Sequence, residues 1–99
     1  MKPTDAVLER LRETVPMLSE KYNVKRIGVF GSYIRNEQKE DSDLDVLVDL
    51  GPEPAFGLFA FVEMEEYLSN TVGVKVDLVM MEGLKPRIGR RILEEVVYL

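Results

Sequence analysis

The chain contains neither cysteine nor histidine. Without cysteine there is no disulfide framework, and nothing indicates secretion. Without histidine, acid–base catalysis by an imidazole and metal binding through an imidazole are both excluded. Long hydrophobic runs are missing too: no segment approaches the length of a membrane span, and residues 1–5 lack the apolar core of a signal peptide. We therefore expect a cytoplasmic protein that does not associate with membranes.

Positive charge is scarcer than negative charge. The 99 residues carry 13 basic and 18 acidic side chains, which gives a formal net charge of −5. Because affinity for long nucleic acids comes largely from neutralising phosphates, we do not expect tight nucleic-acid binding. The length suits one domain with a single core, which we place over residues 1–99.

The hydrophobic periodicity predicts alternating helices and strands. Helices are expected over residues 4–13, from Pro16 onwards, and over 32–37, 56–72 and 86–95, with strands over 26–30, 43–50 and 74–80, a break at 51–54 and an apolar tail at 96–99. Gly28 indicates a close approach by another element, and Gly73 fits a helix C-cap. The elements predict a two-layer α+β fold, in which helices pack on a small mixed sheet of about three strands.

Alternation along residues 43–50 separates a core face from a more polar face. The core face carries Leu44, Val46, Val48 and Leu50, and the other carries Asp43, Asp45, Leu47 and Asp49. Residues 56–72 are expected to turn six apolar side chains inward, namely Leu58, Phe61, Val62, Met64, Leu68 and Val72. The aspartates should therefore lie on the side of the sheet away from this core.

The most informative motif is a Gly31-Ser32 turn followed by Asp43 and Asp45. Both carboxylates point the same way from one strand, with Cα atoms about 6.6 Å apart at about 3.3 Å per residue. They repel each other unless a cation lies between them, and Mg²⁺ is the hard ion that arrives with substrate phosphates. The backbone N–H groups and the hydroxyl of the turn suit those phosphates. The pattern indicates metal-dependent nucleotidyl transfer, and Asp49, two pleats deeper, is left out of the site.

Asp77 supplies a third carboxylate inside an otherwise apolar strand, where a charge is costly unless it is paired or metal-bound. If its strand lies beside residues 43–50, Asp77 joins Asp43 and Asp45. Three converging carboxylates suit two metal ions in an in-line phosphoryl displacement. One ion would hold the triphosphate and the leaving pyrophosphate, and the other would lower the pKa of the attacking hydroxyl. The alternative for Asp77 is an ion pair with Lys75 or Arg26.

Two features near the turn have both a functional and a structural explanation. Gly31 and Ser32 can bind phosphate, or they can form a plain strand-to-helix turn with Ser32 as the N-cap. Arg35, one turn into the helix, can reach a phosphate or pair with Glu37 or Asp41. Both explanations stay open at this point.

A basic cluster lies on the expected last helix and consists of Lys85, Arg87, Arg90 and Arg91. The default is a solvated face, on which these side chains pair with Glu94 and Glu95 at helical spacing. The alternative is a contact for the triphosphate or for an acidic partner surface.

The motif pattern resembles the DNA polymerase β-like nucleotidyltransferase superfamily. The resemblance is carried by Phe30-Gly-Ser-Tyr-Ile-Arg35, Asp41-Ser-Asp-Leu-Asp-Val-Leu-Val48 and Val74-Lys-Val-Asp-Leu-Val79. The small size and the ending from Leu84 to Tyr98 are similar to the minimal nucleotidyltransferases (MNT) of prokaryotic HEPN–MNT toxin–antitoxin pairs. Many members have Arg-Gly-Glu where this chain has Arg35-Asn36-Glu37, and Asn tolerates the left-handed backbone nearly as Gly does.

The resemblance implies a polymerase β-like core and gives roles to the motif residues. The catalytic, metal-binding carboxylates are matched by Asp43, Asp45 and Asp77, and the nucleotide-binding turn by Gly31 and Ser32, with Arg35 beside it. The resemblance also implies ATP as substrate and Mg²⁺ as cofactor, as two ions that Mn²⁺ can replace. It further implies transfer of AMP to a tyrosine hydroxyl of a HEPN-type toxin, which silences that toxin.

Two other functions stay open from the sequence. One is a non-catalytic antitoxin that neutralises its partner by binding, and the other is nucleotide transfer to RNA or to a small molecule. The presence of all three carboxylates favours catalysis, and the acidic net charge argues against RNA as a tightly held acceptor.

Overall fold

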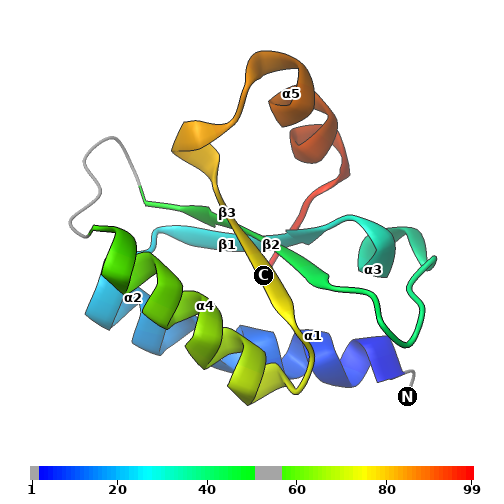
Figure 1. The fold of residues 1–99 in the computed structure, drawn as a ribbon, viewed down its shortest axis with the longest axis horizontal. Helices are drawn as coiled ribbons and strands as arrows, with labels where there is room; N and C mark the ends of the chain where they lie inside the picture. Colours follow the sequence, from blue (N-terminus) through cyan, green and yellow to red (C-terminus); the bar gives the residue numbers. More distant parts are fainter. Residues whose placement is uncertain (1–2, 51–56) are drawn as a thin grey trace.

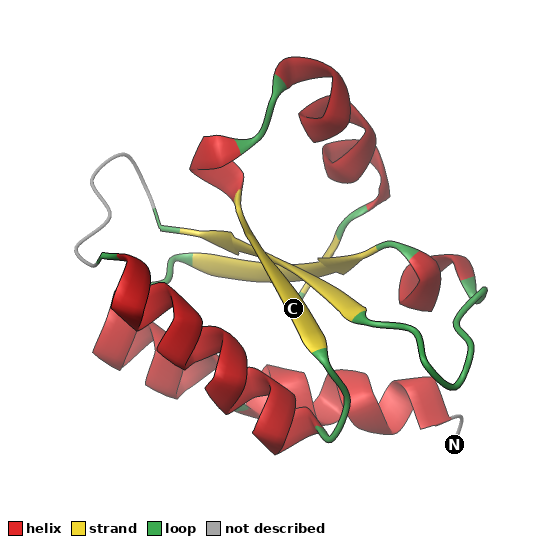
Figure 2. Cartoon of the chain, viewed as in Figure 1, coloured by secondary structure: helices red, strands yellow, loops and turns green. Residues whose placement is uncertain are grey.

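The computed structural model describes residues 3–50 and 57–99 as a twisted sheet with helices on both of its faces (Figures 1 and 2). The elements follow one another as α1 (Pro3–Glu13), α2 (Val15–Tyr22), β1 (Arg26–Phe30), α3 (Ser32–Arg35), β2 (Leu44–Asp49), α4 (Leu58–Val72), β3 (Val76–Met80), the 3₁₀ turn η1 (Met81–Gly83), α5 (Pro86–Glu95) and β4 (Val97–Tyr98). The expected break at 51–54 and the expected helix start at Phe56 lie outside the described residues. Within the described ranges, no helix has the length and apolar character needed to cross a membrane.

The four strands form one mixed sheet in the order β3-β2-β1-β4. β2 runs antiparallel to β1 and parallel to β3, and β4 pairs antiparallel with β1. A parallel pair needs a crossover, which α4 provides between β2 and β3 (Figure 1). The register places Asp45 opposite Phe30 on one side and opposite Asp77 on the other. The predicted α+β class is confirmed, as is the condition that the strand carrying Asp77 lies beside β2.

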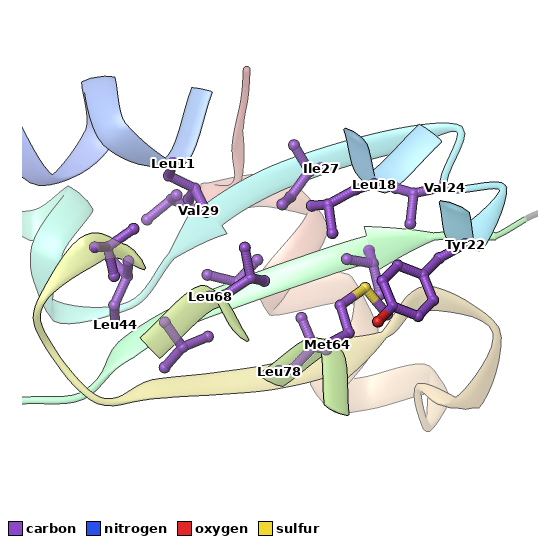
Figure 3. Packing of buried hydrophobic residues seen from close by; sticks show 14 of the residues in the cluster. Leu11, Leu18, Tyr22, Val24, Ile27, Val29, Leu44, Met64, Leu68 and Leu78 are labelled. Atoms are coloured by element: carbon purple, nitrogen blue, oxygen red, sulfur yellow. The ribbon is translucent and has the colours of Figure 1, made fainter. Parts of the chain in front are cut away.

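The main core lies between one face of the sheet and the helices α1, α2 and α4, whereas α5 lies on the side of the opposite face (Figure 1). The core cluster (Figure 3) includes the whole predicted core face of β2: Leu44, Val46, Val48 and Leu50. Burying an aliphatic side chain of this size contributes about 1.5–3 kcal/mol, so this face anchors β2 firmly. Leu47 alternates to the α5 side and is also fully buried. Because side chains on both faces of β2 are buried, the strand holds the backbone of Asp45 in place.

The last residues of the chain form a fourth strand rather than the expected tail. A Cβ on Gly28 would lie 2.5 Å from Val96 Cγ2 and 3.1 Å from Tyr98 Cδ1, so the predicted close approach at Gly28 is confirmed. The approaching element is β4, whose two residues are too few to show an alternating pattern in the sequence.

Some predicted ends and faces differ in detail. The helix expected over 32–37 ends at Arg35, because Asn36 takes a left-handed φ of 60°. Asp43 precedes β2 instead of opening it. Val62 is 43% exposed and so does not point inward, because the buried positions of α4 recur every four residues from Met64 and leave Val62 off that face. The expectation for Leu58 is not tested, because its side chain is not among those that the structure describes.

Candidate active site

Asp45 and Asp77 lie side by side on two parallel strands, as direct register partners on β2 and β3. Asp43 lies two residues before Asp45, just ahead of β2. Asp77 is exposed, whereas Asp43 and Asp45 are half-buried. The backbone therefore brings the three predicted carboxylates to the same end of the sheet.

Asp45 responds electrostatically to its surroundings, including the other two carboxylates. Burial raises the pKa of Asp45, and the charges of Asp77 and Asp43 raise it further, while the charge of Arg35 lowers it. Burial and the neighbouring negative charges all disfavour the ionised form of Asp45, and a cation next to Asp45 would counteract them. The positive charge of Arg35 therefore does not offset the effects that disfavour ionised Asp45.

Carboxylate oxygens are the ligands that Mg²⁺ prefers, so the donor set fits this ion. The side chains, however, are not gathered around one point: in residues 3–50 and 57–99 no group of three or more acidic side chains is placed to hold a metal ion. Asp43 instead turns toward Lys75, whose Nζ lies 4.0 Å from Asp43 Oδ2. The expected convergence is therefore seen in the backbone positions and not in the side-chain conformations. The role of the three aspartates as ligands stays a prediction.

The ion pairs that would explain Asp77 without a ligand are not formed. Arg26 lies 3.4 Å from Asp49, and Lys75 reaches Asp43. Within the described part of the chain, Asp77 makes no ion pair. The exposed carboxylate of Asp77 therefore faces solvent, next to its half-buried register partner Asp45.

Gly31 joins β1 to α3 and lies directly against Asp45. Its φ of 81° lies in the region that favours glycine, and a Cβ at this position would overlap Asp45 Oδ2. The Gly31 carbonyl accepts hydrogen bonds from the N–H groups of Ile34 and Arg35, both at 3.1 Å. Gly31 is thus the N-cap, and the N-cap role considered for Ser32 is wrong. The Ser32 hydroxyl makes no hydrogen bond to any residue that the structure describes, so it remains available to a ligand.

Arg35 forms the pair with Glu37 that the sequence allowed, at 2.9 Å, but not the one with Asp41. It also pairs with Glu95 on α5 at 2.6 Å, across 60 residues of chain. Glu95 further raises the pKa of Asp45. Sequence reasoning missed Glu95 as a neighbour of the site, because its spacing on the helix suggested pairing within α5. No local pattern signals a contact between α3 and α5.

A hollow of about 300 Å³ separates the Gly31 turn from α5. Its walls include Gly31, Arg35 and Asp45 on one side and Arg91, Ile92 and Glu95 on the other. A larger hollow of about 490 Å³ lies along another face of α5, between Met81, Leu84 and Leu93. None of the predicted carboxylates borders the larger hollow, so its size does not make it the site. The smaller hollow combines the turn, a carboxylate and two arginines.

The members of the predicted basic cluster do not all border the same hollow. Arg91 borders the hollow at Asp45, whereas Lys85 and Arg90 border the larger one. The expected pairs of this cluster with Glu94 and Glu95 are not formed among the described residues, and Glu95 pairs with Arg35 instead. Arg91 is therefore the member of the cluster whose charge faces the acidic site.

Comparisons with known proteins agree with this geometry. Residues 9–99 match the family model described as a nucleotidyltransferase domain. Protein adenylyltransferase MntA of Thermococcus cleftensis is 52% identical over 82 residues, which cover 83% of this chain and 81% of the relative. The solved structure of a protein assigned as a minimal nucleotidyltransferase is 37% identical, with a TM-score of 0.77 over 93% of this chain and 92% of that one.

A more distant likeness concerns the fold alone. A solved complex of a tri-AMPylated Shewanella oneidensis HEPN toxin with an MNT antitoxin contains a chain that is 20% identical, with a TM-score of 0.57 over 97% of this chain and 67% of that one. The polymerase β-like fold implied by the motifs is confirmed by these structures. With residues 9–99 matched and relatives this similar, the chain belongs to the nucleotidyltransferase family and is a transferase.

Proposed function

We propose that this chain is a Mg²⁺-dependent adenylyltransferase that moves AMP from ATP to a tyrosine hydroxyl of a HEPN-type toxin and thereby acts as its antitoxin. The observation that carries the proposal is the position of Asp45. It lies against the Gly31 turn on one side and in register with Asp77 on the other. A phosphate-binding turn next to paired carboxylates is what nucleotidyl transfer with a divalent cation requires.

In the proposed reaction, the acceptor oxygen bonds to the α-phosphorus of ATP. The bond between the α- and β-phosphates breaks, the acceptor loses its proton, and pyrophosphate leaves. The chain has no histidine that could take the proton. A tyrosine hydroxyl, with a pKa of about 10, ionises more readily than a sugar hydroxyl, which favours tyrosine as the acceptor.

Asp45 and Asp77 would hold the metal, together with Asp43. When bound, Mg²⁺ neutralises the triphosphate and eases ionisation of the attacking hydroxyl. Asp43 is available for this role because Lys75 Nζ lies as far as 4.0 Å from Asp43 Oδ2, Lys75 is exposed and Asp43 is only half-buried. Burial raises the pKa of Asp45, and the charges of Asp77 and Asp43 raise it further, so a cation bound beside Asp45 would stabilise its ionised form.

The hollow beside Asp45 would receive the nucleotide phosphates. The turn at Gly31 and Ser32 presents backbone and a hydroxyl that bonds to no described residue, without a side chain at residue 31 to block close approach. Arg91 on the opposite wall adds positive charge. Arg35 also borders the hollow, but it would have to give up Glu37 or Glu95 to reach a phosphate.

The choice of acceptor is supported by the relatives. The Thermococcus cleftensis relative is named a protein adenylyltransferase, and the HEPN toxin in the solved complex carries AMP groups. A separate acceptor protein also suits a site with an exposed carboxylate at Asp77, because the partner can then bring its own hydroxyl to it.

The test is to incubate the chain with ATP, Mg²⁺ and a HEPN-type protein encoded next to it, and to measure intact masses. One or more AMP units should appear on the HEPN-type protein. Asp45→Asn should abolish the gain in mass, whereas Asp49→Asn, on the same strand but paired with Arg26, should preserve it.

Two outcomes would contradict the proposal. If toxicity is still neutralised by Asp45→Asn and no AMP is transferred by the wild type, the chain acts as an antitoxin by binding. If AMP appears on RNA or a small molecule instead of the protein, the acceptor class is wrong.

A further inference from the structure

The outer edge of β3 is held by two side chains of α4. Among the described residues β3 is the last strand on its side of the sheet, and its inner edge pairs with β2. On the outer edge, the N–H of Val76 donates to Ser69 Oγ and the N–H of Leu78 donates to Glu65 Oε2, both at 2.9 Å. The Ser69 hydroxyl in turn donates to the carbonyl of Glu65, also at 2.9 Å. We call Glu65 and Ser69 the α4 clamp.

The α4 clamp brackets Asp77. Glu65 and Ser69 lie one helical turn apart, so both face β3. The two N–H groups that donate hydrogen bonds to the clamp belong to the residues immediately before and after Asp77. The backbone around Asp77 is therefore held at its inner edge by β2 and at its outer edge by the clamp.

We propose that Glu65 and Ser69 are positioning residues, which hold Asp77 beside Asp45 so that the two carboxylates can share a divalent cation. The inference rests on the proposed function, because that function gives Asp77 its role as a metal ligand. Asp77 is exposed and makes no ion pair among the described residues, so its place depends on its backbone. Groups that orient metal ligands from behind strongly affect metal affinity.

A purely structural role would give a different pattern. Side chains that satisfy the outer N–H groups of an edge strand also protect it from pairing with other chains. A hollow of about 430 Å³ lies beside the clamp and is bordered by Glu65, Ser69 and Lys75. Water in this hollow can replace a lost acceptor, so we expect clamp variants to fold while the strand becomes less fixed. Metal dependence, rather than stability, therefore separates the two roles.

The experiment measures ATP binding by calorimetry over a series of Mg²⁺ concentrations. Glu65→Ala and Ser69→Ala should raise the Mg²⁺ concentration needed for half-maximal binding about tenfold. Glu65→Gln keeps an oxygen that can accept from Leu78 and should behave like the wild type. Glu66→Ala is the matched control: Glu66 is the exposed neighbour with the same charge, and it has no hydrogen bond or ion pair in the described part of the chain.

The outcomes separate this inference from the proposed function. If wild-type ATP binding depends on Mg²⁺ but Glu65→Ala matches Glu66→Ala, the inference is overturned and the proposed function stands. A lower melting temperature in Glu65→Ala without a change in Mg²⁺ dependence overturns it as well. Wild-type binding that needs no metal overturns the proposed function. If Glu65→Ala does not fold, Ser69→Ala, which removes a single hydroxyl, decides by the same criterion.

Discussion

Asp45 Oδ2 fills the space that a Cβ on Gly31 would need. Gly31 also has a φ of 81° and a ψ of −152°, a backbone region that is essentially restricted to glycine. The contact that places a carboxylate against the turn thus also fixes residue 31 as glycine. A phosphate bound at this turn would lie next to that carboxylate, and the proposed divalent cation would offset the repulsion between the two.

Gly31→Ala should destabilise the fold and abolish nucleotide transfer. The strained backbone alone should cost about 2 kcal/mol, and the overlap with Asp45 adds to it. For a domain of this size, each kcal/mol lowers the melting temperature by about 4–8 °C, which a thermal melt resolves. Gly57→Ala is the control, since its φ is −97° and no described residue lies within 4 Å of the added Cβ. A variant at residue 31 that melts like the wild type would contradict the contact.

Asp45→Asn should raise the melting temperature of the metal-free protein at neutral pH. Burial, Asp77 and Asp43 raise the pKa of Asp45 in the folded state, so the ionised carboxylate lowers stability above that pKa. As the pH falls below the ordinary value of 3.8, the carboxyl is protonated in both states and the advantage of the variant disappears. Melts of both proteins from about pH 3 to about pH 8 measure this difference.

The control for this pH series is Asp49→Asn, which removes a carboxylate that pairs with Arg26 at 3.4 Å. It should not raise the melting temperature at neutral pH. An advantage of Asp45→Asn that persists at low pH would show that ionisation of Asp45 is not its cause. No advantage at any pH would mean that burial and the neighbouring carboxylates do not disfavour the ionised form of Asp45 as described.

Arg91→Gln should weaken binding of Mg²⁺-ATP by a factor of about 10 to 100, because a charged hydrogen bond to phosphate is worth about 1.5–3 kcal/mol. AMP, which lacks the β- and γ-phosphates, should bind both proteins equally. Arg87→Gln makes the same change of charge on the same helix, away from the hollows that Arg91, Lys85 and Arg90 border. Equal losses in the two variants would indicate a general charge effect instead of a contact in the hollow.

Local patterns predicted the frame of the site well. The strand at 26–30, the turn at Gly31 and the core face of β2 follow from apolar alternation and from glycine chemistry, and the structure confirms them. The sequence could not show that Asp45 and Asp77 lie side by side, because that depends on which strands pair. The crossover through α4 satisfies it.

The details that depend on contacts distant in sequence could not be predicted. Arg35 finds Glu95 across 60 residues, and Asp43 turns to Lys75, because side-chain conformations respond to neighbours that no sequence window contains. The contacts of the α4 clamp could not be predicted for the same reason. Glu65 and Ser69 look like ordinary helix residues until β3 is placed against them.

We expect the acidic end of the sheet to admit a triphosphate only when a divalent cation neutralises it. The most direct measurement is calorimetric titration of the wild-type chain with ATP, once with Mg²⁺ and once with EDTA. We predict binding with Mg²⁺, similar binding when Mn²⁺ replaces it, and no measurable binding with EDTA. Equal ATP affinity with Mg²⁺ and with EDTA would contradict the account.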